Sequence, residues 1–114
     1  MDAASGGTAN GTHVQLWTCN NTGAQQWTWN TGDNTIRALG KCMDVTSGGT
    51  ANGTKVQLWT CNGTGAQVWQ PGANRSLVNP QSGKCLDDTG FGGSGTQVQI
   101  WACADSANQQ WNIP

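Results

Sequence analysis

The sequence predicts an all-β fold built from three copies of one unit of about 42 residues. Glycine accounts for 17 of the 114 residues, Glu is absent, and Thr, Asn and Gln fill the spaces between short apolar runs, a composition typical of strands and turns. The pattern Val-Gln-Leu/Ile-Trp-x-Cys occurs three times, ending at Cys19, Cys61 and Cys103 with a constant offset of 42 residues. Seven tryptophans against one phenylalanine is a large aromatic share for which the fold must account.

Each unit is expected to contain four short strands separated by clusters of Gly, Asn and Ser. In the second unit we place them near Thr35 to Leu39, Lys41 to Val45, Lys55 to Thr60, and Gln67 to Gln70. We assign residues 1–114 to one domain, since this is a usual domain size, with repeats at approximately 1–30, 31–72 and 73–114. Met1-Asp2 aligns with Met43-Asp44, so the first repeat lacks its first strand.

The charge content limits the classes of partner. Charged residues make up 10% of the chain, its net charge is −1, and Lys and Arg form no runs. The release of counterions that drives nucleic-acid binding is therefore missing. No apolar stretch approaches the roughly 20 residues that span a bilayer. We expect neither a nucleic-acid partner nor membrane insertion.

Two further motifs recur at the same spacing. Gln-x-Trp occurs at Trp27, Trp69 and Trp111, and Gly-Lys-Cys-Met/Leu-Asp ends at Asp44 and Asp87. Together with Val-Gln-Leu-Trp-x-Cys, these motifs resemble the R-type lectins, the family of the ricin B-chain fold and of related bacterial carbohydrate-binding modules. The resemblance covers the whole chain and implies a β-trefoil, a three-fold barrel capped by hairpins, with up to one shallow sugar site per repeat. It also implies galactose-type or xylose-type ligands, presented as mono- or oligosaccharides or as polysaccharide.

The five cysteines are interpreted through the repeat. It pairs Cys42 with Cys61 and Cys85 with Cys103, and it leaves Cys19 as a free thiol. Such disulfides indicate a secreted, extracellular protein. A zinc site is the competing interpretation, but the cysteine spacings and the single histidine do not match zinc motifs, so we expect no metal and no cofactor. Pairing of two copies through Cys19 or through the open N-terminal strand edge stays an alternative to a monomer.

Strand alternation favours one exposed indole in each repeat. In the second repeat, Gln57 and Trp59 lie on the face opposite to the aliphatic residues of the same strand. If the two bridged cysteines face each other directly, Asp44 stands opposite Trp59. The same rule pairs Asp87 with Trp101 and Asp2 with Trp17. A pyranose can lay its C–H face on the indole while the carboxylate accepts hydrogen bonds from two adjacent hydroxyls.

The resemblance adds amides to each pair, because amides donate and accept hydrogen bonds as sugar hydroxyls do. The candidate sugar-binding residues of the third repeat, which we rank first, are Asp87, Gln99, Trp101, Asn108 and Gln109. Those of the second repeat are Asp44, Gln57, Trp59, Asn62 and Gln67. Those of the first repeat are Asp2, Gln15, Trp17, Asn20 and Gln25. The first two repeats carry Ala24 and Ala66 in place of Asn108, so we expect their second amide to come from Asn20 and Asn62.

Several of these residues also fit purely structural roles. The strand tryptophans could be core residues, since aromatic side chains are usually mostly buried, but the polar strand face favours exposure. The resemblance assigns the Gln-x-Trp tryptophans to the core instead. The aspartates could serve only to tie down turns.

An enzyme is the main alternative class of protein. Glycosidases need two carboxylates about 5–9.5 Å apart across one bond, whereas the aspartates here are spread one per repeat. No catalytic triad can be built around His13, the single histidine. We therefore expect no catalysis. Two alternative functions stay open besides sugar binding by an independent lectin. One is a β-trefoil scaffold for protein interaction or inhibition, and the other is an accessory module cut from a glycoside hydrolase.

Overall fold

The structure is a computed structural model that describes residues 1–20, 22–104 and 106–111. Across these residues the chain forms short strands and single turns of 3-10 helix, as expected from its Gly-rich and Thr-rich composition. The strands are β1 (Asp2–Ala3), β2 (Val14–Gln15), β3 (Thr28–Asn30), β4 (Thr35–Ala38), β5 (Lys41–Val45), β6 (Val56–Trp59), β7 (Gln70–Pro71), β8 (Leu77–Asn79), β9 (Lys84–Asp87) and β10 (Gln99–Trp101). The turns are η1 (Ala4–Gly6), η2 (Gly23–Gln25), η3 (Thr46–Gly48), η4 (Gly65–Gln67), η5 (Ala73–Arg75), η6 (Thr89–Phe91) and η7 (Ala107–Gln109). The end of the third predicted repeat, 112–114, lies outside the described residues.

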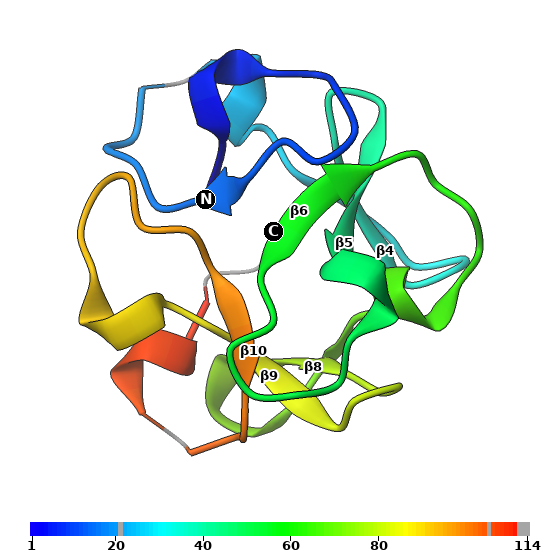
Figure 1. The fold of residues 1–114 in the computed structure, drawn as a ribbon, viewed down its shortest axis with the longest axis vertical. Coiled ribbons are helices and arrows are strands. Elements are labelled where there is room, and N and C mark those ends of the chain that lie inside the picture. The colour runs from blue at the N-terminus through cyan, green and yellow to red at the C-terminus, as the bar shows by residue number, and fades with distance from the viewer. Residues whose placement is uncertain (21, 105, 112–114) are drawn as a thin grey trace.

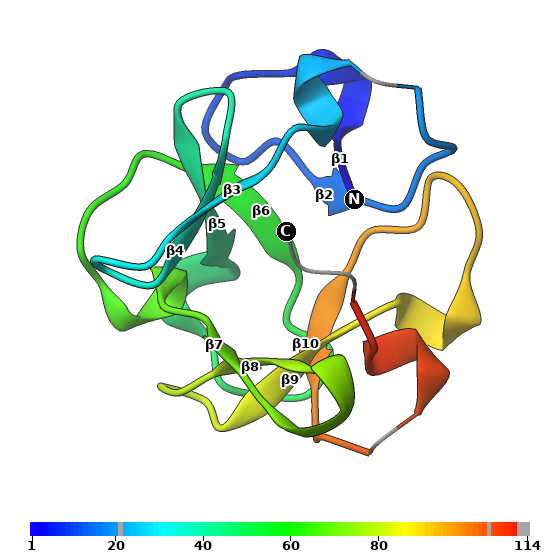
Figure 2. The same ribbon diagram turned by 180° about the vertical axis from the view of Figure 1, so that it is seen from behind.

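The strands form three antiparallel sheets with the orders β1-β2, β3-β4-β5-β6 and β10-β9-β8-β7. Figures 1 and 2 show three lobes around a common axis, the first repeat in blue, the second in green and the third in yellow to red. The last strand of one repeat opens the sheet of the next, since β3 pairs with β4 and β7 with β8. Among the described residues the first repeat has no counterpart of β4 or β8, which confirms the missing strand. The architecture is the β-trefoil that the resemblance implied.

Main-chain hydrogen bonds in and just before β2, β6 and β10 join the three repeats. Val56 N–H donates to Val98 O at 3.0 Å, and Val98 N–H donates to Val14 O at 2.9 Å. Leu58 N–H donates to Thr12 O at 2.8 Å. These bonds close a ring in which each repeat borders both others, so the central strands have no open edge.

The core lies inside this ring. One valine of each repeat is fully buried there: Val14, Val56 and Val98. Leu58 and Ile100 are also fully buried, whereas Leu16, at the same position of the first repeat, is only partly buried. The first repeat, with its two-stranded sheet, therefore has less cover over its apolar residues.

An open hollow of about 710 Å³ adjoins the first repeat. Its walls include Cys19, Trp27, Trp29 and Trp111. Trp27 and Trp111 are half-buried, whereas Trp69, at the equivalent position of the second repeat, is fully buried. The core role predicted for the Gln-x-Trp tryptophans thus holds fully for Trp69 and in part for the other two.

The predicted fourth strand of the second repeat is wrong. Gln67 belongs to the 3-10 turn η4, and β7 begins only at Gln70. The turn closes with Gln67 N–H donating to Thr64 O at 3.1 Å. Gln67 and Trp69 are both fully inaccessible to solvent.

The predicted strand register is shifted by two residues. Asp44 faces Gln57 rather than Trp59, and Trp59 faces Cys42. The disulfide does not mark a directly opposed pair, because Cys61 lies beyond the end of β6. The same shift pairs Asp87 with Gln99 and Asp2 with Gln15. A shift by an even number keeps every side chain on its face of the sheet, so each aspartate still shares a side with its tryptophan.

The disulfides follow the predicted pairing. Cys42 and Cys61 are joined with an S–S distance of 2.01 Å, and Cys85 and Cys103 with 1.95 Å. Cys19 is free and exposed. The two Cα atoms of each bridge are 5.1 Å apart. The bridges connect β5 and β9, the strands that carry the aspartates, to the loops that follow the exposed tryptophans.

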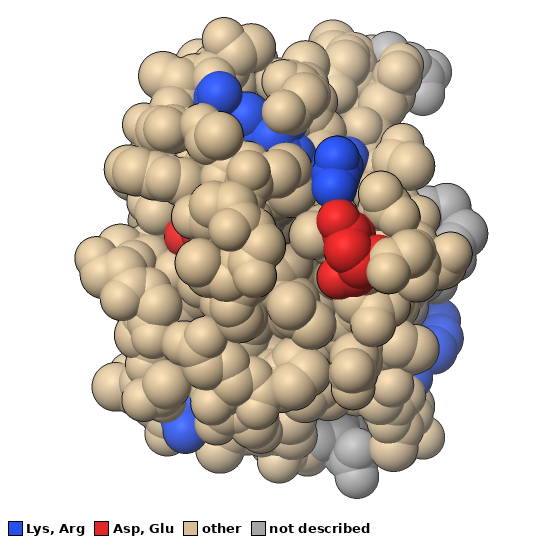
Figure 3. All heavy atoms as spheres, turned by 90° about the vertical axis from the view of Figure 1, so that its right-hand side faces the viewer, with Lys and Arg blue, Asp and Glu red and all other residues tan. Residues whose placement is uncertain are grey.

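Charged side chains are sparse on the face shown in Figure 3. One surface ion pair joins Arg37 Nη2 to Asp33 Oδ2 at 2.8 Å. The Thr35 hydroxyl, which donates to the Asp33 carboxylate, is the main cause that lowers the pKa of Asp33, and Arg37 adds to it. No helix in the described ranges has the length and apolar character needed to cross a membrane.

We expect Trp69→Ala to lower the free energy of unfolding by about 3–5 kcal/mol, because this indole is fully buried and donates to Met43 O at 3.1 Å. Trp17→Ala is the control, because Trp17 is 49% exposed and its loss should cost less than about 1 kcal/mol. Urea unfolding followed by circular dichroism measures both. Equal losses in the two variants would show that the assignment of core and surface tryptophans is wrong.

Candidate functional site

A carboxylate, an amide and an exposed indole share one face of each repeat. In the second repeat Asp44 on β5 faces Gln57 on β6, and Trp59 lies two residues further along β6 on the same side. Val56 and Leu58, which alternate with them, are fully buried. The apolar residues of β6 thus fix which side faces the core, and the polar pair and the indole are left facing outward.

The three strand tryptophans reach solvent. Trp17 is 49% exposed, Trp59 38% and Trp101 44%. The aspartates beside them are nearly buried, at 4–5% exposure. Each repeat therefore presents a flat apolar ring next to a carboxylate set deeper in the surface.

Each of these groups lines a shallow hollow, with volumes of about 610, 600 and 450 Å³ in the first, second and third repeats. The predicted residues that line them are Asp2, Gln15, Trp17 and Asn20; Asp44, Gln57, Trp59 and Asn62; and Asp87, Gln99, Trp101, Asn108 and Gln109. The remaining walls come largely from the turns η1, η3 and η6, which follow the aspartate strands. The predicted Gln25 and Gln67 are not among the lining residues.

Amide groups hold the carboxylate of the second repeat in place. Gln57 Nε2 donates to Asp44 Oδ1 at 3.2 Å, and Gln67 Nε2 donates to Asp44 Oδ2 at 2.9 Å. A carboxylate offers about four acceptor positions. Asp44 thus keeps about two for an incoming donor.

The carboxylate of the third repeat is more fully engaged. Asp87 accepts from Gln99 at 3.0 Å, from Gln109 at 2.9 Å and from Asn108 at 3.1 Å. It keeps about one acceptor position. The carboxylates of the three hollows therefore differ in the number of hydrogen bonds that they can still accept from a ligand.

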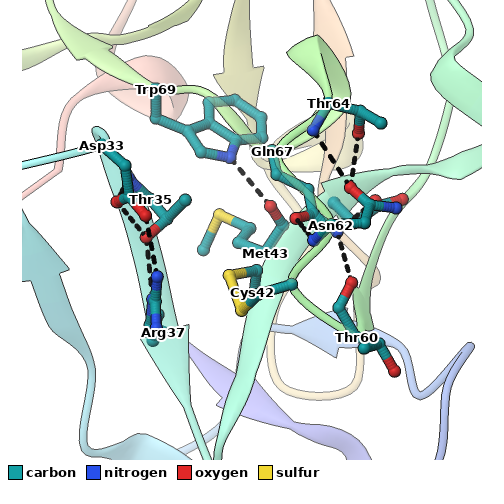
Figure 4. Close-up of a disulfide and its surroundings, with 12 residues drawn as sticks. Asp33, Thr35, Arg37, Cys42, Met43, Thr60, Asn62, Thr64, Gln67 and Trp69 are labelled. Atoms are coloured by element: carbon teal, nitrogen blue, oxygen red, sulfur yellow. Dashed lines mark hydrogen bonds and ion pairs between the residues drawn. A yellow bond between two sulfur atoms is a disulfide. The ribbon is translucent and has the colours of Figure 1, made fainter.

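The Gln-x-Trp motif fixes the backbone around the aspartate, and Figure 4 shows the bonds of Gln67 and Trp69 in the second repeat. Gln67 Nε2 also donates to Thr60 O at 2.9 Å, and its Oε1 accepts from Asn62 N–H at 3.0 Å. Trp69 Nε1 donates to Met43 O, next to the aspartate. One glutamine therefore connects the loop after the exposed tryptophan to the carboxylate, and the buried tryptophan anchors both to β5.

The backbone bonds of this glutamine recur in the other repeats. Gln109 donates to Ala102 O at 3.0 Å and accepts from Ala104 N–H at 2.8 Å. Gln25 makes the same two backbone bonds, to Thr18 O at 2.9 Å and from Asn20 N–H at 2.8 Å, but within the described ranges it makes none to Asp2. Gln67 and Gln109 are 0% and 2% exposed. Both amides therefore position the carboxylate and the loop, and the sugar contact expected of them from the sequence stays a prediction.

The asparagines of the first two repeats keep free donors. Asn62 Oδ1 accepts from the N–H of Thr64 at 3.1 Å and from its hydroxyl at 2.7 Å, which forms an Asx turn. Asn20 makes the same turn with Thr22. In the part of the chain that the structure describes, the Nδ2 groups of both asparagines have no acceptor. They are available to a ligand in the hollow.

Asn108 uses its amide inside the protein. Its Nδ2 donates to Asp87 Oδ2 and to Asp88 O, both at 3.1 Å, and its Oδ1 accepts from the Ser106 hydroxyl. It therefore orients Asp87 rather than presenting an amide outward. We ranked the third repeat first because of Asn108, and these bonds give that ranking no support.

The residue after each exposed tryptophan is in hydrogen-bond contact with a loop of another repeat. Asn10 Oδ1 accepts from Thr60 N–H at 2.8 Å, and Asn52 Oδ1 accepts from Ala102 N–H at 2.9 Å. The hydroxyls of Thr18 and Ser94 are 3.2 Å apart. The three contacts fix the strand ends that carry the exposed tryptophans.

A cation of the second repeat reaches the third hollow. Lys55 Nζ donates to Gln99 Oε1 at 3.1 Å and to Thr89 Oγ1 at 3.3 Å. The ammonium group thus holds the amide of Gln99 so that its Nε2 faces Asp87. At the equivalent position the first repeat has His13 and the third has Gln97.

Asp88 occupies a position beside the third hollow that is apolar in the other repeats. Its equivalents Ala3 and Val45 are fully buried. Burial raises the pKa of the Asp88 carboxyl, and the charge of Asp87 raises it further. Its Oδ1 is buried and has no partner in the described ranges. Because the folded state favours the protonated form, the stabilising contribution of Asp88 is present in acid and is lost as the pH rises through its folded-state pKa.

Gln81 and Phe91 are among the wall residues of the hollows that sequence reasoning missed. Gln81 of the third repeat lines the second hollow and donates to Gly48 O at 3.0 Å. Phe91 lines the third hollow and is 65% exposed. Alignment of the repeats could have identified Phe91, because it stands where the others have Gly6 and Gly48. Gln81 carries no such signal, since it reaches the second hollow only through the fold.

The arrangement is suited to a neutral polar ligand with one apolar face. The indole offers a flat surface to C–H groups, and the carboxylate accepts strong hydrogen bonds from adjacent hydroxyls. In the described ranges, no three His, Cys, Asp or Glu side chains gather in a way that could hold a metal ion. The hollows thus offer stacking and hydrogen bonding as their means of recognition.

The ricin-type beta-trefoil lectin domain family matches residues 1–111. In structure the chain is similar to the agglutinin from Abrus precatorius, with a TM-score of 0.88 and 28% identity, over 97% of this chain and 42% of that one. It is also similar to a non-toxic homologue of type II RIPs from Momordica charantia (bitter gourd), solved in complex with α-methyl-D-galactoside, with a TM-score of 0.84 and 27% identity, over 98% of this chain and 42% of that one.

In sequence the chain is 44% identical over 43 residues to Nigrin b from Sambucus nigra, a match that covers 38% of this chain and 8% of Nigrin b. The chain thus spans less than half the length of each of these proteins.

We expect Gln67→Leu to destabilise the fold, because it leaves the Asp44 carboxylate, Thr60 O and Asn62 N–H without this partner, at about 1–3 kcal/mol for each buried group left unpaired. Gln25→Leu is the matched control and should cost less, because Gln25 is half-buried and makes only the two backbone bonds. Urea denaturation gives both free energies. An equal loss in Gln25→Leu would mean that the bond to the carboxylate contributes little.

Proposed function

This chain belongs to the family of ricin-type beta-trefoil lectin domains, and from that premise we propose that it is a non-catalytic module that binds sugars in up to three shallow hollows. The observation that carries the proposal is the repeated placement of a half-exposed indole beside an amide-held aspartate, at Trp17, Trp59 and Trp101. The aspartates are positioned to accept hydrogen bonds from hydroxyls, and the indoles to stack on a ring.

Galactose-type sugars are the leading ligands in this proposal, with xylose-type sugars as the second choice. The Momordica charantia homologue was solved with α-methyl-D-galactoside, and a galactose ring has both a C–H face for the indole and neighbouring hydroxyls for the carboxylate. In the first two hollows the free Nδ2 groups of Asn20 and Asn62 supply the complementary donors. The third hollow has Ala104 at that position and would bind by other contacts.

Three separate hollows favour binding to a surface that carries many sugars. Weak individual sites gain avidity when one protein engages several of them at once, so we propose glycans or polysaccharide as the partner. The two disulfides favour an oxidising, extracellular location. Glycosidase chemistry needs two carboxylates facing one bond, and the hollows place their aspartates in different repeats.

Two other functions remain as proposals for comparison. A β-trefoil that serves as a protein-interaction or inhibitor scaffold would bind its partner even in excess free sugar. An accessory module of a glycoside hydrolase would bind sugar in the same hollows, with the catalytic domain elsewhere in a longer protein. Competition with free sugar separates the scaffold from both lectin-like functions.

The proposal is tested by a glycan array followed by titration of the best-bound sugar against tryptophan fluorescence. We expect saturable changes at up to millimolar concentrations, because the exposed indoles lie where the ring would stack. Trp101→Ala should abolish the response of the third hollow and change stability by less than about 1 kcal/mol. If no sugar alters the fluorescence, the sugar-binding proposal fails.

The exposed thiol of Cys19 supports a separate proposal, that two copies of the chain join through it. The repeat leaves this cysteine without the partner that Cys61 and Cys103 have. We expect a dimer band on a non-reducing gel that disappears on reduction and in Cys19→Ser. A chain that stays monomeric while its thiol also resists alkylation would contradict the exposure assigned to Cys19.

A further inference from the structure

The single phenylalanine of the chain occupies a position that is glycine in the other repeats. Phe91 follows Asp87 at the same distance as Gly6 follows Asp2 and Gly48 follows Asp44. The three positions share a left-handed backbone, with φ values of 56°, 63° and 62°. Glycine adopts this conformation without penalty, whereas a large side chain does so only at a cost in free energy.

The side chain of Phe91 gains no core packing that could offset this cost in free energy. Phe91 is 65% exposed, the highest exposure among the large apolar side chains that the structure describes as exposed. A bulky residue in a rare backbone region is a reason to look for a function. The third hollow lies beside this side chain, because Phe91 is one of its wall residues.

Phe91 and Trp101 line the same hollow of about 450 Å³. The first and second hollows have one large aromatic side chain each, Trp17 and Trp59, and their walls at the equivalent position are Gly6 and Gly48. The third hollow is thus the one with two aromatic side chains. Apolar groups make up a larger share of its wall than in the other two hollows, although its volume is smaller.

The third hollow also offers fewer free hydrogen-bonding groups than the other two. Asp87 already accepts from three amides, and Asn108 uses both amide hydrogens internally. Ala104 stands where the other repeats have Asn20 and Asn62 with free donors. The third hollow therefore relies more on stacking and less on hydrogen bonds than the other two.

We propose that Phe91 makes the third hollow an oligosaccharide site, in which one pyranose stacks on Trp101 and the next ring of the same chain contacts Phe91. This inference rests on the proposed sugar-binding function and specifies its ligand. The first and second hollows, with a single aromatic ring each, take one sugar unit. The three hollows thus differ in the length of ligand that they prefer.

The test uses the indole N–H signals of Trp17, Trp59 and Trp101 in ¹⁵N NMR titrations of the full chain, which report each hollow separately. Galactose and lactose form one ligand pair, and xylose and xylobiose the other. At Trp101 we expect the disaccharide to bind roughly 3- to 10-fold more tightly than the monosaccharide, the range that one added aromatic contact supplies. At Trp17 and Trp59 the two affinities should be nearly equal.

Phe91→Gly restores the residue that the other repeats carry at this backbone conformation, so it should fold normally. We expect it to reduce the disaccharide preference at Trp101 towards that of the other hollows. Gly6→Phe is the reciprocal variant, since a Cβ added at Gly6 meets no atom within 4 Å. It should create a disaccharide preference at Trp17.

The outcomes separate this inference from the function on which it rests. If monosaccharides shift the indole signals but Phe91→Gly leaves the ratio at Trp101 unchanged, the inference is overturned and the sugar-binding function stands. A gain seen with p-nitrophenyl galactoside but not with either disaccharide would show that Phe91 selects an aromatic substituent, and the assignment of a second sugar ring would be wrong. If no sugar shifts any indole signal, both fail.

Discussion

The second and third repeats each depend on one glutamine amide, Gln67 or Gln109, that is buried and holds the aspartate of the hollow. In the second repeat Gln67 bonds the Asp44 carboxylate and both ends of the loop that leaves β6. Trp69, two residues later, fills the core and donates to the backbone of β5. The motif therefore fixes three things at once: the core, the loop and the carboxylate. Since the amide is buried, a side chain that could not both donate and accept would leave several polar groups without partners.

The sequence predicted the three-fold repeat directly, and the resemblance of its motifs to R-type lectins predicted the β-trefoil architecture. The limits of β5 were predicted from the turn residues that separate the strands. The burial of alternate residues on β6 follows from apolar alternation. The register was wrong by two residues, because a cystine was taken as a directly opposed pair when one of its cysteines lies beyond the strand. The error was harmless to the site, since an even shift leaves Asp44 and Trp59 on the same face.

The roles of the amides could not be predicted, because they depend on burial and not on residue type. Gln67 and Asn108 were expected to meet the ligand, and both are instead bonded to the aspartates that they hold in place. A sequence shows that an amide is near a site but not whether its hydrogens are already used. Phe91 is different: its substitution for glycine could have been read from the repeats, and only its place in a hollow required the fold.

The strand end that carries each exposed tryptophan is supported by another repeat, through loops at Asn10, Asn52 and Ser94. The neighbour also differs from hollow to hollow, as the contact of Lys55 with Gln99 illustrates. The order in which the three repeats follow one another therefore helps to determine the binding surface. Joining the same three repeats in the reverse order around the ring would place each exposed tryptophan beside a loop of a different repeat, without any amino-acid substitution.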